Sequence, residues 1–109
     1  MKDHVKGGAL TEVTLYILLA LYKPNHGYGI MQFVEVETEG RLTLGAGTLY
    51  GALNTLVNKG WIALYGEEST KKKKNYLITD LGKEKVEVEL NRLKEVLEKG
   101  QSIVNGESR

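Results

Sequence analysis

Apolar residues recur at helical spacing along four stretches of the chain, and two shorter stretches near the middle have the composition of strands. The predicted helices span residues 9–22, 28–38, 46–58 and 80–104, and the predicted strands span residues 61–65 and 75–79, with a further short strand at 41–44. In the second half, a helix, a hairpin and a new helix follow one another. This order indicates a mainly α fold with a small β-hairpin, arranged as a winged helix-turn-helix with a long C-terminal helix.

The last predicted helix carries a coiled-coil-like seam. Its apolar positions are separated by four, three, four and seven residues: Val86, Leu90, Leu93, Leu97 and Val104. At 1.5 Å per residue this helix reaches about 37 Å, which is too long for its stripe to be buried on so small a domain. We therefore predict a homodimer, with residues 1–79 as the winged helix-turn-helix domain, residues 80–105 as a dimerisation helix and residues 106–109 as a frayed tail.

The third predicted helix has a polar face opposite its leucine stripe. That face is made of Thr48, Gly51, Asn54, Thr55 and Asn58. Short polar side chains and a glycine allow a helix to approach the major groove of DNA, where asparagine can pair with adenine. Four consecutive lysines, residues 71–74, fall at the tip of the predicted hairpin, where they can straddle a phosphate backbone. Both features predict binding to double-stranded DNA.

Charge is unevenly distributed although the net charge of the chain is only +1. Residues 41–79 hold six basic and two acidic side chains, whereas residues 1–40 hold three basic and five acidic ones. The positive charge therefore gathers where a DNA contact is expected. The chain has no cysteine, and its longest apolar run, residues 13–22, is too short for a membrane span. With no signal-peptide pattern, we expect a cytoplasmic protein.

Four short motifs follow the same order as these elements. They are Pro24-Asn25-His26-Gly27-Tyr28-Gly29-Ile30, Gly47-Thr48-Leu49-Tyr50 with Ala52-Leu53, Lys59-Gly60-Trp61-Ile62, and Asn75-Tyr76-Leu77-Ile78-Thr79 with Gly82. In these residues the chain resembles the PadR family of bacterial winged-helix transcriptional regulators, and its single C-terminal helix is similar to the short subfamily. The resemblance implies a homodimeric repressor in which the last helix lies against the partner's first helix. It also implies an effector cavity at that interface, where a hydrophobic compound relieves repression.

The polar helix, the basic hairpin and the resemblance together give two candidate sites. The DNA contact is predicted at Tyr28, Gly47, Thr48, Tyr50, Gly51, Asn54, Thr55, Asn58, Lys59, Lys71, Lys72, Lys73 and Lys74. The dimer and effector interface is predicted at Ala9, Val13, Tyr16, Ala20, Val86, Leu90, Leu93 and Leu97. The expected partners are a palindromic DNA operator, a second copy of the chain and a small hydrophobic effector, with no cofactor and no metal.

Other functions have weaker support in the sequence. Gly45-Ala46-Gly47-Thr48 precedes a helix, but it lacks the glycine and lysine spacing of a nucleotide-binding loop. His26 is better interpreted as a hydrogen-bonded turn residue than as a metal ligand or proton sensor. No nucleophile, base and acid can be nominated together, so catalysis is not expected. The alternative that stays open is a winged-helix module that binds an acidic protein surface and has no DNA operator.

Overall fold

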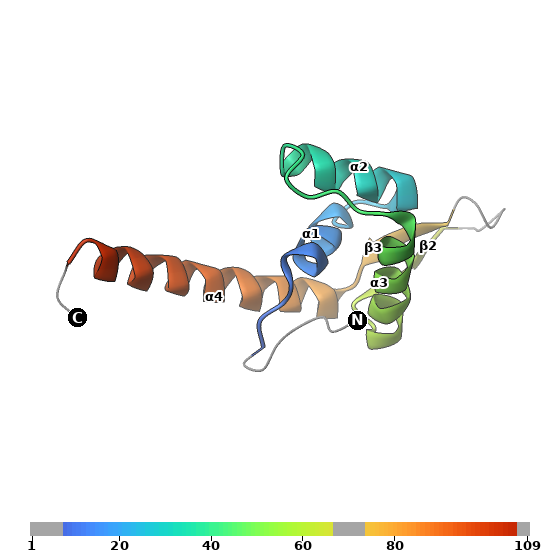
Figure 1. Cartoon of the computed structure of the whole chain (residues 1–109). Coiled ribbons are helices and arrows are strands. Elements are labelled where there is room, and N and C mark those ends of the chain that lie inside the picture. The colour runs from blue at the N-terminus through green and yellow to red at the C-terminus, as the bar shows by residue number, and fades with distance from the viewer. Residues whose placement is uncertain (1–7, 67–73, 107–109) are drawn as a thin grey trace.

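The structure, a computed structural model, describes residues 8–66 and 74–106. In these ranges the elements follow in the order α1 (Glu12–Ala20), β1 (Asn25–His26), α2 (Gly27–Glu37), α3 (Ala46–Lys59), β2 (Ile62–Tyr65), β3 (Asn75–Ile78) and α4 (Asp80–Val104). The molecule measures 59 × 28 × 23 Å because α4 extends well beyond the other elements (Figure 1). The prediction of a mainly helical winged-helix fold with a long last helix is confirmed.

The sheet contains one more strand than the predicted hairpin. Its order is β1-β3-β2, and both pairings are antiparallel. Asn25 is the partner of Tyr76, so β1 uses residues that we had interpreted as a plain turn. His26 ends this strand and caps α2, because its Nδ1 accepts the backbone N–H of Gly29 at 3.2 Å. A two-residue strand has no periodicity of its own, so only its pairing with β3 defines it.

The predicted strand at residues 41–44 is wrong, because that segment is a loop. Thr38 holds the start of the loop: its hydroxyl donates to the Val34 carbonyl at 2.8 Å and accepts the Leu42 N–H at 3.0 Å. Glu39 and Gly40 both adopt positive φ angles, of 52° and 82°. The backbone therefore turns on itself here, with the N–H groups of Arg41 and Leu42 bound to Thr38 rather than to a neighbouring strand.

The first helix is shorter than predicted at both ends. It begins at Glu12, because the Thr11 hydroxyl caps it by accepting the Thr14 N–H at 3.1 Å. It ends at Ala20, and the next carbonyl, of Leu21, accepts the N–H of Ile78 at 2.9 Å. The chain thus leaves α1 to join the sheet, which periodicity alone does not reveal.

The core lies where α1, α2, α3 and the inner side of the sheet meet. Its fully buried side chains include Ile17, Leu18, Leu21, Ile30, Leu49, Leu53, Leu56 and Ile62. Ala20 and Val86, which we had assigned to the dimer and effector interface, belong to this same core. Within the described ranges, no helix has both the length and the hydropathy needed to span a membrane.

A set of four residues, which we call the α3–α4 junction, ties the end of α3 to the start of α4. It consists of Gly60, Trp61, Thr79 and Gly82. Gly60 ends α3 with a φ of 79°, and the Thr79 hydroxyl donates to its carbonyl at 2.7 Å. The Trp61 carbonyl accepts the Thr79 N–H at 2.9 Å, and a Cβ on Gly82 would lie 2.2 Å from that carbonyl oxygen. Only glycine at position 82 permits this close approach.

Candidate nucleic-acid interface

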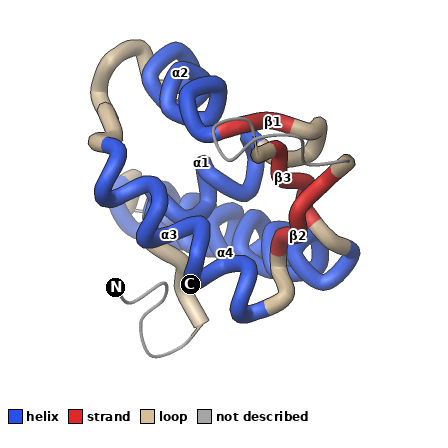
Figure 2. The backbone as a smooth tube through the Cα atoms, turned by 90° about the vertical axis from the view of Figure 1, so that its right-hand side faces the viewer, coloured by secondary structure: helices blue, strands red, loops and turns tan. Residues whose placement is uncertain are grey.

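Helix α3 presents an exposed ridge opposite its buried stripe. The outer ridge, as we call it, consists of Gly47, Gly51, Asn54 and Asn58, which are spaced by four, three and four residues and so align on one side of a helix. All four are exposed, whereas the other side buries Leu49, Ala52, Leu53 and Leu56. Figure 2 shows α3 in the foreground of the view, with the sheet beside it and α4 behind it.

The two glycines of the outer ridge have no structural role that the described residues reveal. A Cβ added to Gly47 or Gly51 would meet no described atom within 4 Å, and neither residue has a positive φ. Gly51 lies in the helix interior, where a glycine is destabilising by about 0.5–1 kcal/mol relative to alanine, whereas Gly47 lies in the first turn. Glycine is also the residue that lets a helix backbone approach another surface closely, so this ridge has the composition of a contact surface.

The predicted DNA contacts flank this ridge on two sides. On one side are Thr48, Thr55 and Lys59, with the Thr55 hydroxyl donating to the Gly51 carbonyl at 3.1 Å and the Lys59 Nζ lying 5.2 Å from the Trp61 ring centroid. Tyr50 lies on the other side of the ridge. Thr55 is therefore partly committed to its own helix, and Lys59 lies beside the α3–α4 junction.

Two tyrosines sit where α2 meets the first turns of α3. The Tyr50 hydroxyl packs over Gly27, where a Cβ would come within 2.2 Å of it. Tyr28, at the start of α2, is 63% exposed, and its hydroxyl accepts a hydrogen bond from the Gln32 side chain at 3.3 Å. Both phenol groups reach the surface and can donate to a phosphate oxygen.

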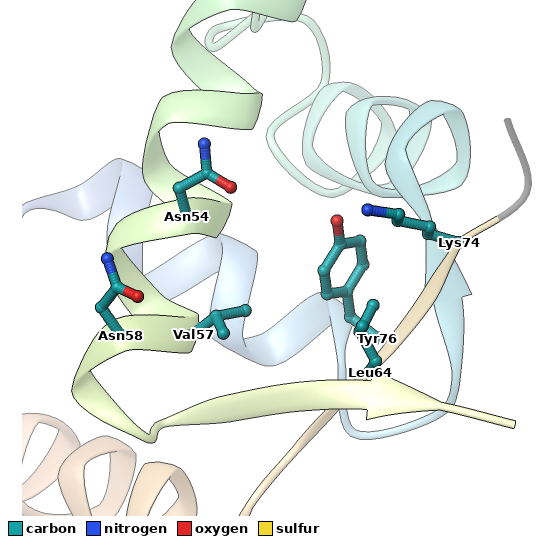
Figure 3. A pocket seen from close by; sticks show the side chains of 6 residues that line it. All are labelled: Asn54, Val57, Asn58, Leu64, Lys74 and Tyr76. Atoms are coloured by element: carbon teal, nitrogen blue, oxygen red, sulfur yellow. The ribbon is translucent and has the colours of Figure 1, made fainter. Parts of the chain in front are cut away.

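A cleft separates α3 from the β2–β3 hairpin (Figure 3). This α3–hairpin cleft has a volume of about 350 Å³ and is lined by Asn54, Val57, Asn58, Leu64, Lys74 and Tyr76. Lys74 is the described member of the predicted lysine run, and Lys71, Lys72 and Lys73 lie outside the described residues. The predicted DNA contacts do not include Val57, Leu64 and Tyr76 of this cleft, because apolar and aromatic side chains in these elements are typical of core positions. Two signals were available in the sequence: Val57 follows Asn54 by three residues on the same helix, and Leu64 lies in the middle of β2.

The predicted dimer and effector residues are divided among three places. Tyr16, Leu90 and Leu93 line a groove of about 390 Å³ between α1 and α4. Val13 is half-buried against the core, Ala9 is half-buried before α1, and Ala20 and Val86 are inside the core. Leu97 lies farther along α4, on an open surface of that helix with Val96, Gly100, Gln101, Val104 and Asn105. The groove and the seam beyond it are exposed in a single chain.

The family model of the PadR-like transcriptional regulators matches residues 7–88. The chain belongs to this family. This is a family of non-enzymatic transcriptional regulators that act by binding DNA, so the chain is a PadR-like regulator of transcription. The outer ridge of α3 and the α3–hairpin cleft both lie within the matched range.

Solved structures have the same fold over most of the chain. A PadR family regulator from Clostridium difficile R20291 has a TM-score of 0.70 at 23% identity, covering 86% of this chain and 99% of that one. A PadR family regulator from Eggerthella lenta scores 0.66 at 24% identity, with 84% and 80% covered. A putative transcriptional regulator from Thermoplasma acidophilum scores 0.64 at 28% identity, with 85% and 90% covered. No curated protein sequence matches the chain.

Two ion pairs border the groove between α1 and α4 in this PadR-like regulator. Glu89 is only 3% exposed, and both of its oxygens accept from Arg92, at 2.7 and 2.9 Å. The guanidinium holds the pKa of Glu89 below its ordinary value, and the backbone of Leu10 adds to this effect against the opposing effect of burial. Arg41 likewise lowers the pKa of Glu12 by a two-pronged hydrogen bond, which ties the loop before α3 to the start of α1.

Proposed function

We propose that this PadR-like regulator is a homodimeric repressor that reads a palindromic operator with the outer ridge of α3. The observation that carries the proposal is the composition of this ridge. Two glycines without an internal role come first, and two asparagines follow, one turn apart. The glycines permit close approach to the floor of the major groove, and an asparagine amide can pair with both N6 and N7 of adenine. The half-site therefore contains adenine.

The second copy is inferred from α4. Leu90, Leu93, Leu97 and Val104 continue one apolar seam, and all four are exposed in the single chain. A coiled-coil partner would bury this seam, and the two α3 helices of such a dimer would lie about 34 Å apart, one turn of the duplex. In this proposal residues 1–79 contact DNA and residues 80–105 join the protomers. Sedimentation equilibrium of the purified chain tests the dimer directly.

We propose that the effector binds in the groove between α1 and α4, which is lined by Tyr16, Leu90 and Leu93. A hydrophobic compound bound there would also contact the partner's helix, and it would relieve repression by favouring a dimer whose α3 helices no longer match the operator. Its effect is limited to the difference between its affinities for the two dimer geometries.

The test begins with selection of tight-binding duplexes from a random pool, followed by fluorescence anisotropy at several salt concentrations. The Asn54→Ala variant is expected to bind the selected operator about tenfold more weakly or worse, with no change on random DNA. Asn91→Ala removes an exposed asparagine from α4 and is the matched control. An alanine replacement of residues 71–74 is expected to weaken binding to every duplex and to flatten the salt dependence.

Equal and weak binding to all duplexes would contradict this proposal. That result would favour the alternative in which the hairpin and α3 bind an acidic protein surface.

A further inference from the structure

The α3–hairpin cleft is lined in part by apolar side chains, which the recognition of DNA bases by α3 does not require. Its middle holds two exposed apolar side chains, Val57 of α3 (39% exposed) and Leu64 of β2 (53% exposed), and Figure 3 shows the largely buried Tyr76 between them with its hydroxyl toward Lys74. Its margins are polar, with the amides of Asn54 and Asn58 on the α3 side and the ammonium of Lys74 on the hairpin side. Among the described residues, the ion pairs of the chain do not include Lys74.

The position of the cleft limits what can enter it. The major and minor grooves of a duplex are separated by a sugar–phosphate backbone. If α3 lies in the major groove, the hairpin beside it is on the far side of one strand, so the cleft between them faces that strand rather than the base edges. This step rests on the proposed role of α3.

The backbone of DNA alternates apolar and charged groups, and the lining of the cleft likewise places polar groups beside apolar ones. Each deoxyribose presents an apolar edge, with hydrogen in place of hydroxyl at the 2′ carbon, and each is flanked by two charged phosphates. Val57 and Leu64 suit the sugar edge, whereas the Lys74 ammonium and the Asn58 amide can donate to a phosphate oxygen. Directly between Val57 and Leu64, the 2′ hydroxyl of a ribose would lose water to two side chains that can neither donate nor accept a hydrogen bond.

We propose that the α3–hairpin cleft binds one deoxyribose of the operator between Val57 and Leu64, with Lys74 on the adjacent phosphate. These residues therefore select deoxyribose at one position of each half-site. Val57 and Leu64 add specificity for the sugar, and the asparagines of the outer ridge provide specificity for the base.

The experiment replaces single deoxynucleotides of the selected operator with ribonucleotides, one position at a time in both half-sites, and measures affinity by anisotropy. The wild-type chain is expected to lose about tenfold in affinity at one position per half-site. In the Val57→Ala variant this loss of affinity is expected to be less than about threefold, because the loss depends on contact between the Val57 side chain and the added 2′ hydroxyl. Val36→Ala, which removes an exposed valine from α2, is the matched control and keeps the full loss. Ribonucleotides at other positions control for changes in sugar pucker.

A second series replaces thymine by uracil, which removes the 5-methyl group and leaves the sugar unchanged. The proposal expects no loss that depends on Val57 in this series. A uracil-sensitive position that Val57→Ala silences would overturn it, since the cleft would then hold a base methyl group. Specific operator binding without any Val57-dependent ribonucleotide effect would also overturn it and leave the repressor function standing. Absence of specific binding to any duplex would overturn both.

Lys74→Ala provides an independent readout. If Lys74 contacts a phosphate, the variant binds the operator and random DNA more weakly by the same factor, and the slope of log affinity against log salt falls by about 1. An unchanged slope would contradict the phosphate contact.

Discussion

The α3–α4 junction and the outer ridge of α3 each contain two glycines and two larger residues. Contacts and backbone angles of the described residues explain why glycine is needed in the junction, but not in the ridge. In the junction, Gly60 supplies a left-handed turn, Gly82 permits contact with the Trp61 carbonyl, and Thr79 is hydrogen-bonded through both its hydroxyl and its N–H. In the ridge, no described contact requires either glycine. The two sets are alike in their two glycines, but contacts and backbone angles within the chain account for the glycines of the junction only.

The difference separates glycines that the fold itself requires from glycines for which the described residues show no requirement. A fold requires glycine where a Cβ would collide with another group or where the backbone adopts a positive φ. At Gly82 that requirement is a backbone oxygen of the chain itself. At Gly47 and Gly51 the described residues supply no such requirement, and the proposed contact with DNA would supply one.

The largest effect is expected from Gly82→Ala. The new Cβ would lie 2.2 Å from the Trp61 carbonyl oxygen and 2.7 Å from a side-chain carbon of Ile78, and the oxygen belongs to rigid backbone. We expect a destabilisation of about 3 kcal/mol, seen as a lower midpoint of urea unfolding with an unchanged slope. A variant as stable as the wild-type chain would mean that the junction is looser than its hydrogen bonds indicate.

A second comparison uses two carboxylates of α4. Glu89 is buried against Arg92, whereas Glu95 pairs with Lys99 at 3.9 Å with both side chains mostly exposed. Glu89→Gln is expected to cost about 1.5 kcal/mol at neutral pH, and Glu95→Gln less than about 0.5 kcal/mol. The matched pair separates the effect of burial from the effect of losing one negative charge.

The dependence on pH sharpens this prediction. The pKa of Glu89 in the folded chain is below its ordinary value of 4.5, so its contribution is complete above that pH and is lost as the pH falls through the folded pKa. Thermal unfolding at several pH values should therefore show the gap between Glu89→Gln and the wild-type chain closing in acid. A gap that persists unchanged below that pKa would show that charge is not its cause.

The smallest effect, and the most direct test of the comparison, is expected from Gly51→Ala. Since the new Cβ meets nothing within 4 Å among the described residues, the variant should gain about 0.5–1 kcal/mol of stability from helix propensity. Its affinity for the selected operator should nevertheless fall, because the Cβ would project toward the groove. Thermal unfolding and anisotropy on the same preparation measure both. If the variant is more stable and its affinity for the operator is unchanged, the outer ridge does not contact DNA.

Much of the fold was predictable because its signals are local. The range of α4, Asp80–Val104, agrees with its prediction because Thr79 caps its start and its apolar spacing is regular to the end. Helix α3 was placed to within one residue, since Gly60 marks its end. The start of α1 was misplaced, because Ala9 and Leu10 are compatible with a helix and only the Thr11 cap excludes them from it.

The candidate site was predictable in its residue types and less so in its grouping. Asn54 and Asn58 follow from helical spacing alone. Their proximity to Leu64 and Lys74 does not, because it depends on how the hairpin folds back beside α3. Likewise, the apolar pattern of α1 marked Ala20 as a surface residue, and the pattern of α4 did the same for Val86. Packing within the chain buries both.

The sequence by itself determined the presence of the four helices, the start of α4 after Thr79, the end of α3 at Gly60, the polar face of α3 and the family, since each depends on residues within a few turns of one another. The tertiary structure decided which apolar positions remain available to a partner, that Asn25 and His26 form a third strand, and that a cleft opens between α3 and the hairpin. These features depend on contacts between residues far apart in the chain. Local periodicity reports that a side chain needs burial, but only the packed structure shows what buries it.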